Sequence, residues 1–273
     1  MRLDIVIPAH NEEHRIDATL TAYRAVCSDP DARFVVALDD CSDRTADIVA
    51  AHALEDERVR GHRFPKLGKG GVIMETFRRS DADLMAFVDA DCATPPAELL
   101  RLAATMDEAG VDGAIATRWH PAAVLPARRS ASRRLASAVF AFFVRRLFRL
   151  PFRDTQCGAK VLRRNLVERV VPLLSSRDFL FDVDLLVTSR ALGFRIVEVP
   201  TVWVDRPGSR VGVGRDSKRM AASLLRLWLH HRVLPVVATT MAYPDDPTIT
   251  APPRVAEAMP AQADDPDRDA HVG

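Results

Sequence analysis

The sequence has few of the residues that mark zinc-binding or disulfide-bonded proteins. It holds four cysteines in 273 residues, at positions 27, 41, 92 and 157, and no two of them form a Cys-X-X-Cys pair. This spacing indicates neither a zinc site nor a disulfide framework, so a reducing cytoplasmic compartment fits best. The formal net charge is only +1, which gives no overall basis for binding nucleic acid.

Long hydrophobic runs are also missing. The longest uncharged apolar runs, Leu135–Val144 and Val233–Tyr243, are too short to span a bilayer. The first residues enter a strand pattern at once, which predicts that no signal peptide is present. We therefore expect a protein that is either soluble or peripheral to a membrane.

Acidic residues are absent from one long stretch. None occurs between Asp112 and Asp154, although 27% of the whole chain is charged. The basic residues of this stretch are Arg118, Arg128, Arg129, Arg133, Arg134, Arg145, Arg146, Arg149 and Arg153. A segment with charge of a single sign should face anions.

What the first half of the chain does contain is a regular alternation of two patterns. Short apolar runs predict strands at 3–8, 34–38, 58–64, 84–88 and 111–116. Helical spacing of apolar residues predicts helices near 11–26, 42–54, 68–80 and 95–109. Alternating strands and helices predict an α/β fold with a mostly parallel central sheet flanked by helices.

The second half is less regular. Helices are expected near 132–150, 165–174, 182–192 and 217–231, and strands near 195–199 and 202–204. We expect a single domain over residues 1–235, because 48% hydrophobic residues suffice for one substantial core. Residues 243–273 are rich in proline, alanine and aspartate without periodic apolar positions, which predicts a disordered tail.

Two carboxylates, Asp89 and Asp91, follow the predicted strand 84–88 directly. Hard oxygen ligands at positions i and i+2 after a strand can share one ion, and Mg²⁺ or Mn²⁺ would suit them with a diphosphate completing the shell. The crevice outside the strand ends is where open α/β sheets bind ligands. A pair of solvated turn aspartates explains the same residues equally well when they are taken alone.

Two further turns after strands could meet a nucleotide. Gly68–Gly71, which includes Lys69, could bring backbone amides and an ammonium to it, although a plain flexible turn is the alternative. The segment matches neither a P-loop nor a Gly-X-Gly-X-X-Gly motif. Asp39 and Asp40 could accept hydrogen bonds from a base and a ribose, and a helix-capping turn with Ser42 is the alternative.

The predicted helix 132–150 carries arginines on one strip and large apolar residues on the other. The apolar side is formed by Leu135, Val139, Phe142, Phe143 and Leu147. Such a helix is suited to an anionic lipid surface. An ordinary helix packed on the sheet would have the same periodicity, but a surface helix normally mixes charges of both signs.

Two loops concentrate polar groups. The segment 154–160 follows an apolar helix, and a turn is its simplest interpretation; nothing in the sequence requires Cys157 to be a nucleophile. The segment 206–210 has an arginine at each end and could clamp a diphosphate.

Five ordered motifs give the chain a family resemblance. They are Ile5–Glu13, Leu38–Thr45, Lys69–Gly71, Asp89–Asp91 and Asp154–Lys160. Together they resemble the inverting glycosyltransferases of family 2, which have a GT-A (Rossmann-like) fold. More narrowly they look like polyprenyl- and dolichyl-phosphate sugar synthases, and Asp154–Lys160 looks like the dolichyl-phosphate glucosyltransferase branch. The resemblance covers residues 3–230.

The resemblance assigns roles to individual positions. It implies that a nucleotide sugar is bound by Pro8, Ala9, Asn11, Glu13, Asp39, Asp40, Lys69, Asp89 and Arg206. It implies that Asp89 and Asp91 hold Mg²⁺ or Mn²⁺, and that the acceptor lipid phosphate is bound by Arg118, Arg133, Ser137 and Gln156. Asp91, Asp154 and Arg206 are the expected catalytic residues, with Asp154 orienting acceptor or sugar.

Three departures from the family pattern bear on the expected function. Ala93 stands where some relatives have a further metal ligand, Arg210 replaces a frequent lysine, and no C-terminal membrane spans follow. Membrane attachment would then rest on the arginine-rich segment 118–153 or on an anchoring partner.

We expect metal-dependent transfer of a hexose from a nucleotide sugar, with UDP-glucose favoured, to a polyprenyl or dolichyl phosphate. The enzyme would be cytoplasmic and peripheral on the inner membrane face. Alternatives are GDP-mannose as donor, a soluble phosphorylated or natural-product acceptor, and a non-catalytic nucleotide-binding scaffold. A sugar nucleotidyltransferase would need a glycine-rich basic turn after the first strand, which this chain lacks.

Overall fold

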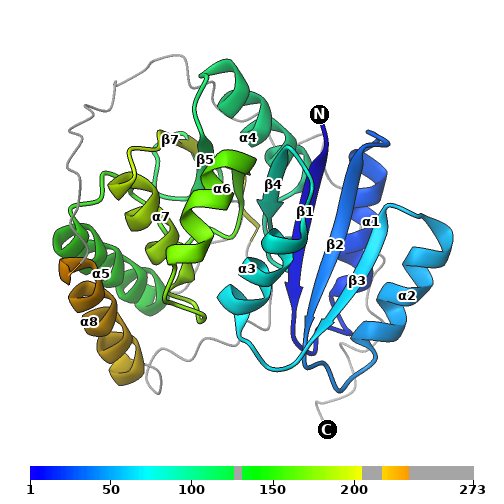
Figure 1. Cartoon of the computed structure of the whole chain (residues 1–273), viewed down its shortest axis with the longest axis horizontal. Coiled ribbons are helices and arrows are strands. Elements are labelled where there is room, and N and C mark those ends of the chain that lie inside the picture. Colours follow the sequence, from blue (N-terminus) through cyan, green and yellow to red (C-terminus); the bar gives the residue numbers. More distant parts are fainter. Residues whose placement is uncertain (126–130, 205–216, 234–273) are drawn as a thin grey trace, which may run out of the picture.

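A computed structural model describes residues 1–125, 131–204 and 217–233 of the chain. The predicted tail, 243–273, lies outside these residues. The described residues form one α/β unit around a single sheet (Figure 1). Within these residues, no helix combines the length and the apolarity that crossing a bilayer requires.

Seven strands form the sheet, in the order β3-β2-β1-β4-β6-β5-β7. Their bounds are β1 Leu3–Ala9, β2 Ala32–Asp39, β3 Val59–Phe64, β4 Leu84–Phe87, β5 Gly113–Thr117, β6 Lys160–Arg163 and β7 Ile196–Pro200. All neighbouring pairs are parallel except those made by β6, which runs antiparallel to both β4 and β5. The sheet is therefore mostly parallel, as the sequence predicts.

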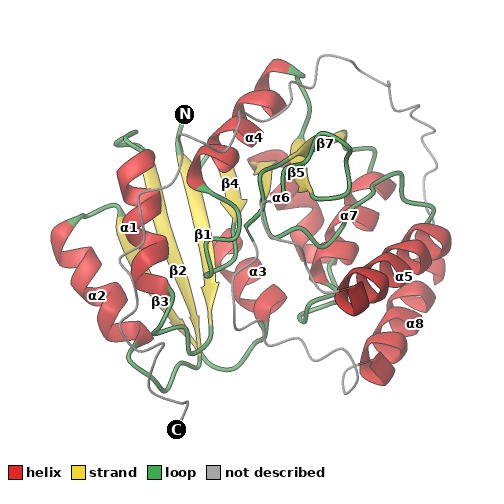
Figure 2. Cartoon of the chain, turned by 180° about the vertical axis from the view of Figure 1, so that it is seen from behind, coloured by secondary structure: helices red, strands yellow, loops and turns green. Residues whose placement is uncertain are grey.

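The helices cover both faces of this sheet (Figure 2). Their bounds are α1 Ile16–Val26, α2 Thr45–Glu55, α3 Lys69–Arg79, α4 Pro96–Glu108, α5 Ala131–Phe148, α6 Arg164–Val170, α7 Phe181–Ala191 and α8 Ser217–Val233, with a short 3-10 turn at Val171–Leu173. Helices α1, α2 and α4 share one buried cluster with the sheet, and α3, α6 and α7 share the other. Helices α5 and α8 contact each other and add Val144, Leu224 and Leu227 to the second cluster.

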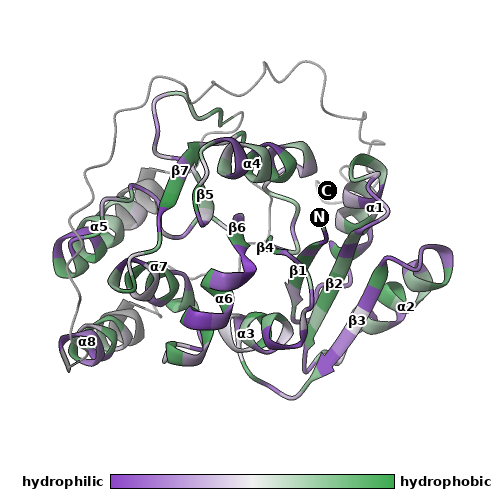
Figure 3. Ribbon diagram, turned by 45° about the horizontal axis from the view of Figure 1, so that its top comes forward, coloured by the Kyte–Doolittle hydropathy of each residue, from purple (hydrophilic) through white to green (hydrophobic). Residues whose placement is uncertain are grey.

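The alternation of side chains along each strand explains these two cores. Ile5 and Ile7 of β1 face the cluster of α1, α2 and α4, while Val6 between them faces the other. Strands that are buried on both faces read as continuous apolar runs, which is why β1 and β2 are evident in the sequence. Edge strand β3 is the polar exception, and Figure 3 shows it largely hydrophilic.

Two details of the second half differ from the sequence-based expectation. β6 lies within a segment for which we predicted no strand, because its four residues Lys160–Arg163 begin and end on cations and carry no visible alternation. The expected strand 202–204 forms only an isolated bridge from Val202 to Val124. The other strands are confirmed within a few residues at their ends.

Candidate active site

Three parallel strands end at one edge of the sheet, and most of the predicted site residues follow them. β1 leads into the loop that holds Asn11 and Glu13, β2 ends at Asp39, and β4 leads into Asp89 and Asp91. The carboxyl ends of parallel neighbours meet at the same edge, so the topology gathers residues that are up to eighty positions apart in sequence.

Asp89 is held between a lysine and a glycine. Its Oδ1 lies 2.7 Å from Nζ of Lys69, the first residue of α3. Its Oδ2 packs against Gly158, where an added Cβ would stand 1.9 Å from that oxygen. Burial acts to raise the pKa of Asp89, but the charges of Lys69, Lys160 and Arg118 outweigh it and hold the pKa below its ordinary value.

Asp91 is partly exposed, and among the described residues only the backbone N–H of Ala93 donates to its Oδ1, at 3.0 Å. Burial and the negative charge of Asp89 both raise its pKa, because two like charges share one place. Among the described residues no group of three or more His, Cys, Asp or Glu side chains stands together. Mg²⁺ and Mn²⁺ need only one or two carboxylates when phosphates and water complete the shell, so the pair fits such an ion.

Hydrogen bonds join Asp39 to the start of the glycine-containing segment 68–71. The Asp39 carboxylate accepts hydrogen bonds from the backbone N–H groups of Leu67, at 2.6 Å, and Gly68, at 3.1 Å. Gly68 has φ +80, a conformation that favours glycine, and a Cβ at Gly70 would stand 2.4 Å from Phe181. These glycines therefore satisfy turn geometry and close packing, whatever else they contact.

The loops after β1 and β2 are joined by hydrogen bonds. The Asn11 side chain accepts from the backbone N–H of Ser42 at 2.8 Å, and Glu13 accepts from that of Arg44 at 3.1 Å. Asn11 and Asp40 both have positive φ, of 55 and 52, which short polar side chains tolerate. Asp40 is exposed, whereas Asp39 is only 4% exposed.

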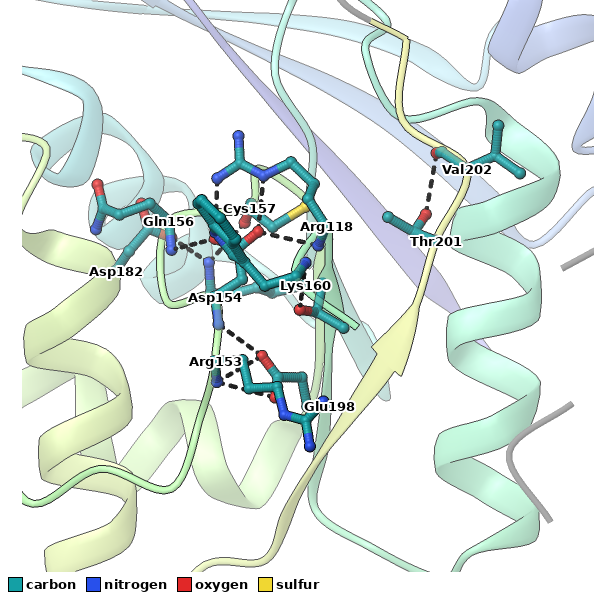
Figure 4. Close-up of polar contacts among 12 residues, drawn as sticks. Arg118, Arg153, Asp154, Gln156, Cys157, Lys160, Asp182, Glu198, Thr201 and Val202 are labelled. Carbon is teal, nitrogen blue, oxygen red and sulfur yellow. Dashed lines mark hydrogen bonds and ion pairs between the residues drawn. The ribbon is translucent and has the colours of Figure 1, made fainter. Parts of the chain in front are cut away.

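Asp154 makes a two-pronged ion pair with Arg118, which follows β5 (Figure 4). Nε of Arg118 donates to Oδ2 at 2.7 Å, Nη2 donates to Oδ1 at 2.9 Å, and the backbone N–H of Arg118 donates to Oδ2 at 3.0 Å. Burial acts to raise the pKa of Asp154, but Arg118 more than offsets this and the pKa is lowered. The guanidinium also lies over the Trp203 ring, 5.2 Å from its centroid.

The loop that carries Asp154 is held from β7 by Glu198, a residue that we did not predict. The Glu198 carboxylate accepts hydrogen bonds from the backbone N–H groups of Arg153, at 2.9 Å, and Asp154, at 2.7 Å. Burial raises the pKa of Cys157, in the same loop, to about 12. Burial therefore disfavours the thiolate, which is the nucleophilic form of cysteine.

A second unpredicted pair lies beneath Asp89. Lys160, the first residue of β6, is 0% exposed, and its Nζ donates to Asp182 in the first turn of α7. Asp182 also faces Lys69, with Oδ2 3.9 Å from that Nζ. Nothing in the sequence distinguishes Asp182 from the neighbouring Asp184, and only the packing of α7 against α3 and β6 separates their roles.

Of the other described residues predicted to bind the acceptor or the diphosphate, the structure places only Gln156 beside Asp154. Ser137 lies on α5, and within the described residues no hydrogen bond joins it to Arg118 or Asp154. Gln156 is beside Asp154, and its Nε2 is buried with no hydrogen-bond partner among the described groups. Arg133 belongs to α5, but its side chain is outside the described part of the structure, as is all of Arg206.

The chain is similar in sequence to known glycosyltransferases. The model of the family described as glycosyl transferase family 2 matches residues 4–171. Glycosyltransferase AglD of Haloferax volcanii is 30% identical over 86% of this chain, which spans 38% of that protein. Dolichyl-phosphate beta-glucosyltransferase of Dictyostelium discoideum is 29% identical over 82% of this chain and 73% of its own length.

A solved structure shares the fold. Glucosyl-3-phosphoglycerate synthase from Mycobacterium tuberculosis, crystallised with Mn²⁺, uridine diphosphate and glucosyl-3-phosphoglycerate, superposes with a TM-score of 0.60 at 17% identity. The match covers 83% of this chain and 79% of the other. The fold of the described residues thus has a counterpart among proteins of known structure.

Proposed function

The chain belongs to glycosyltransferase family 2 and is a nucleotide-sugar-dependent glycosyltransferase, and from that premise we propose that it transfers glucose from UDP-glucose to a polyprenyl or dolichyl phosphate. The observation that carries this proposal is the closeness of two charged centres. The Asp89 and Asp91 pair suits a metal-bound diphosphate, and Arg118 suits a phosphate. The loop 154–160 contacts both centres, because Asp154 pairs with Arg118 and Gly158 packs against Asp89.

On the donor side, a divalent cation held by Asp89 and Asp91 would draw charge from the departing nucleoside diphosphate. Lys69 adds a positive charge at the same place, since its pKa is raised by Asp89 and Asp182 despite burial. Arg206, outside the described residues, is our proposed further cation for the diphosphate. The residues that would bind the nucleoside lie at the ends of β1 and β2 and in the loops that follow them: Pro8, Ala9, Asn11, Glu13, Asp39 and Asp40.

On the acceptor side, a phosphate monoester already carries negative charge at pH 7, so its attack on the anomeric carbon needs no strong base. Asp154 is ionised and committed to Arg118 by two hydrogen bonds, which suits an orienting role. In Figure 4 the Nη1 atom of Arg118 points away from Asp154. We assign this outward-pointing edge of the guanidinium to the acceptor phosphate, together with Nε2 of Gln156, which has no hydrogen-bond partner among the described groups.

A lipid acceptor requires contact with a membrane, and α5 has the surface for it. Its exposed large apolar residues are Val139, Phe142, Phe143 and Leu147. Leu225 and Leu229 of the neighbouring α8 are exposed as well. Neither helix contains an acidic residue, so both suit an anionic leaflet. We propose peripheral binding at the cytoplasmic face, with Arg133 and Ser137 near the lipid phosphate.

The test is direct product analysis. Purified protein with Mn²⁺ and UDP-glucose would be offered undecaprenyl phosphate in vesicles or 3-phosphoglycerate in solution, with GDP-mannose as the alternative donor. We expect a glucose-linked lipid that does not form with Asp91→Ala or after chelation of the metal. Transfer only to 3-phosphoglycerate would overturn the lipid acceptor, and transfer only from GDP-mannose would overturn the donor. No transfer at all, with nucleotide binding intact, would favour a binding scaffold.

A further inference from the structure

Lys69 stands between two carboxylates that belong to different elements. Its Nζ is 2.7 Å from Oδ1 of Asp89, after β4, and 3.9 Å from Oδ2 of Asp182, on α7. The Lys69 side chain is 31% exposed and that of Asp89 is 38% exposed, whereas that of Asp182 is only 3% exposed. One ammonium thus links an accessible carboxylate to a buried one.

The approach to Asp89 is limited on both of its oxygens. Oδ2 packs so closely on Gly158 that a Cβ at that position would overlap it. Oδ1 is occupied by the Lys69 ammonium. A divalent cation that binds Asp89 must therefore come close to the Lys69 ammonium, and the two positive charges repel each other.

Asp182 is fixed in place by a second lysine. Its Oδ1 accepts from Nζ of Lys160, which also donates to the backbone carbonyl of Cys157 at 2.8 Å. Both ammonium groups lie by the Phe87 ring, Lys160 at 5.1 Å and Lys69 at 6.0 Å from its centroid. With Oδ1 held by Lys160, the other oxygen of Asp182 remains directed at Lys69.

We propose that Asp182 is a positioning residue that receives the Lys69 ammonium when a divalent cation takes Asp89. This inference rests on the proposed function, since it concerns the metal-bearing donor site. Lysine has a flexible stem with three rotatable donors, so a small rotation transfers the ammonium from one carboxylate to the other. The transfer removes a competing cation from the metal ligand and keeps a positive charge beside the diphosphate.

The experiment measures Mn²⁺ binding by electron paramagnetic resonance, without nucleotide or acceptor. The double variant K160M/D182N removes the buried pair without changing the net charge, and we expect about fivefold weaker Mn²⁺ binding because Lys69 then stays on Asp89. Lys69→Met removes the competitor, and we expect about fivefold tighter binding. In the triple variant K69M/K160M/D182N the affinity should equal that of Lys69→Met alone.

Equal Mn²⁺ affinities of the triple variant and of Lys69→Met would show that the buried pair acts through Lys69. A general effect on the fold or on the local electric field would persist without Lys69. A pair variant that weakens Mn²⁺ binding equally with and without Lys69 would overturn the proposal, as would a pair variant with unchanged affinity. Arg78→Met, an exposed cation on the same helix α3, is the matched control and should not change the affinity. If the variants change Mn²⁺ affinity as expected but the unaltered protein does not transfer glucose, the result would count against the proposed function and not against this inference.

A measurement on the unaltered protein covers the case in which K160M/D182N does not fold. The ¹⁵N-labelled side-chain ammonium of Lys69, assigned by its absence in Lys69→Met, should shift on titration with Mg²⁺, while that of Lys66 should not. A Lys69 signal that stays constant through saturation with Mg²⁺ would overturn the proposal.

Discussion

At the scale of single residues, the site depends on one position without a side chain. Gly158 leaves room for the Asp89 carboxylate, since a Cβ there would lie 1.9 Å from Oδ2 and 2.5 Å from Cγ. Lys69 holds the opposite oxygen of the same group. The orientation of the proposed metal ligand thus depends on a glycine in the loop 154–160, which precedes β6.

Gly158→Ala should therefore displace Asp89 while leaving the fold intact. A misplacement of about 1 Å at a reacting centre can lower activity on the order of 100-fold, and we expect a loss of that size in kcat/KM with weaker Mn²⁺ binding. Steady-state kinetics and Mn²⁺ titration measure both effects.

Gly110→Ala is the matched control. Gly110 has φ +59 with nothing near its absent Cβ, so this change should lower stability by about 1 kcal/mol without affecting activity. Full activity in Gly158→Ala would contradict the proposed role of the contact.

At the scale of elements, a buried carboxylate attaches α8 to the rest of the molecule. Asp184 of α7 is 0% exposed and accepts from Nε2 of His231 on α8, at 2.7 Å. It also accepts from the backbone N–H groups of Ser175, at 2.7 Å, and Ser176, at 2.8 Å. Burial acts to raise the pKa of Asp184, but His231 and these N–H groups more than offset it, so the pKa is lowered.

This lowered pKa fixes the sign of a pH effect. Ionised Asp184 stabilises the fold at pH values above its pKa in the unfolded chain, which is about 3.9. This stabilisation is lost as the pH falls from that value to the lower pKa of Asp184 in the folded protein. Asp184→Asn should cost about 2–4 kcal/mol at pH 5.5, because an amide cannot satisfy all these donors. The difference from the unaltered protein should shrink at pH 3.5, as measured by urea unfolding at both pH values.

Asp107→Asn is the comparison for this prediction. Asp107 is 62% exposed and pairs with Arg163 at the surface, so its loss should change the unfolding free energy by less than about 1 kcal/mol. If the difference in unfolding free energy between Asp184→Asn and the unaltered protein grows on acidification, ionised Asp184 is not the stabilising group.

At the scale of the whole molecule, α5 packs on the same core as the sheet whose edge carries the proposed site. Phe142 and Phe143 are 64% and 50% exposed, and on the opposite side of the same helix Val144 is fully buried against the core. The helix is thus anchored by one side and presents the other. Its arginines favour an anionic partner over a neutral one.

The double variant F142S/F143S should weaken binding to anionic vesicles by about 30-fold, which corresponds to about 2 kcal/mol of lost apolar burial. Binding of the unaltered protein should also fall as salt is raised, because the arginine contribution is screened. Vesicle sedimentation measures both effects. Leu54→Ser, which alters a 91% exposed apolar residue on α2, should have no effect; equal losses from both variants would contradict a specific surface on α5.

The sequence by itself determined the mostly parallel sheet and the sheet edge at which we propose that the donor binds. β4 is a continuous apolar run and β1 is nearly so, and Asp89 and Asp91 follow shortly after β4, so the strands and the carboxylate pair were visible from local pattern. The pairing of Asp154 with Arg118 was not visible, because each was assigned separately and nothing local reveals an ion pair over 36 positions.

Only the tertiary structure decided which polar residues support these groups. Strand β6 reverses direction between β4 and β5, and that reversal buries Lys160 against Asp182 and brings Gly158 onto Asp89. Glu198 reaches the same loop from β7. Such contacts join residues that are distant along the chain, and the packing energy that selects them is collective, so no stretch of sequence encodes them alone.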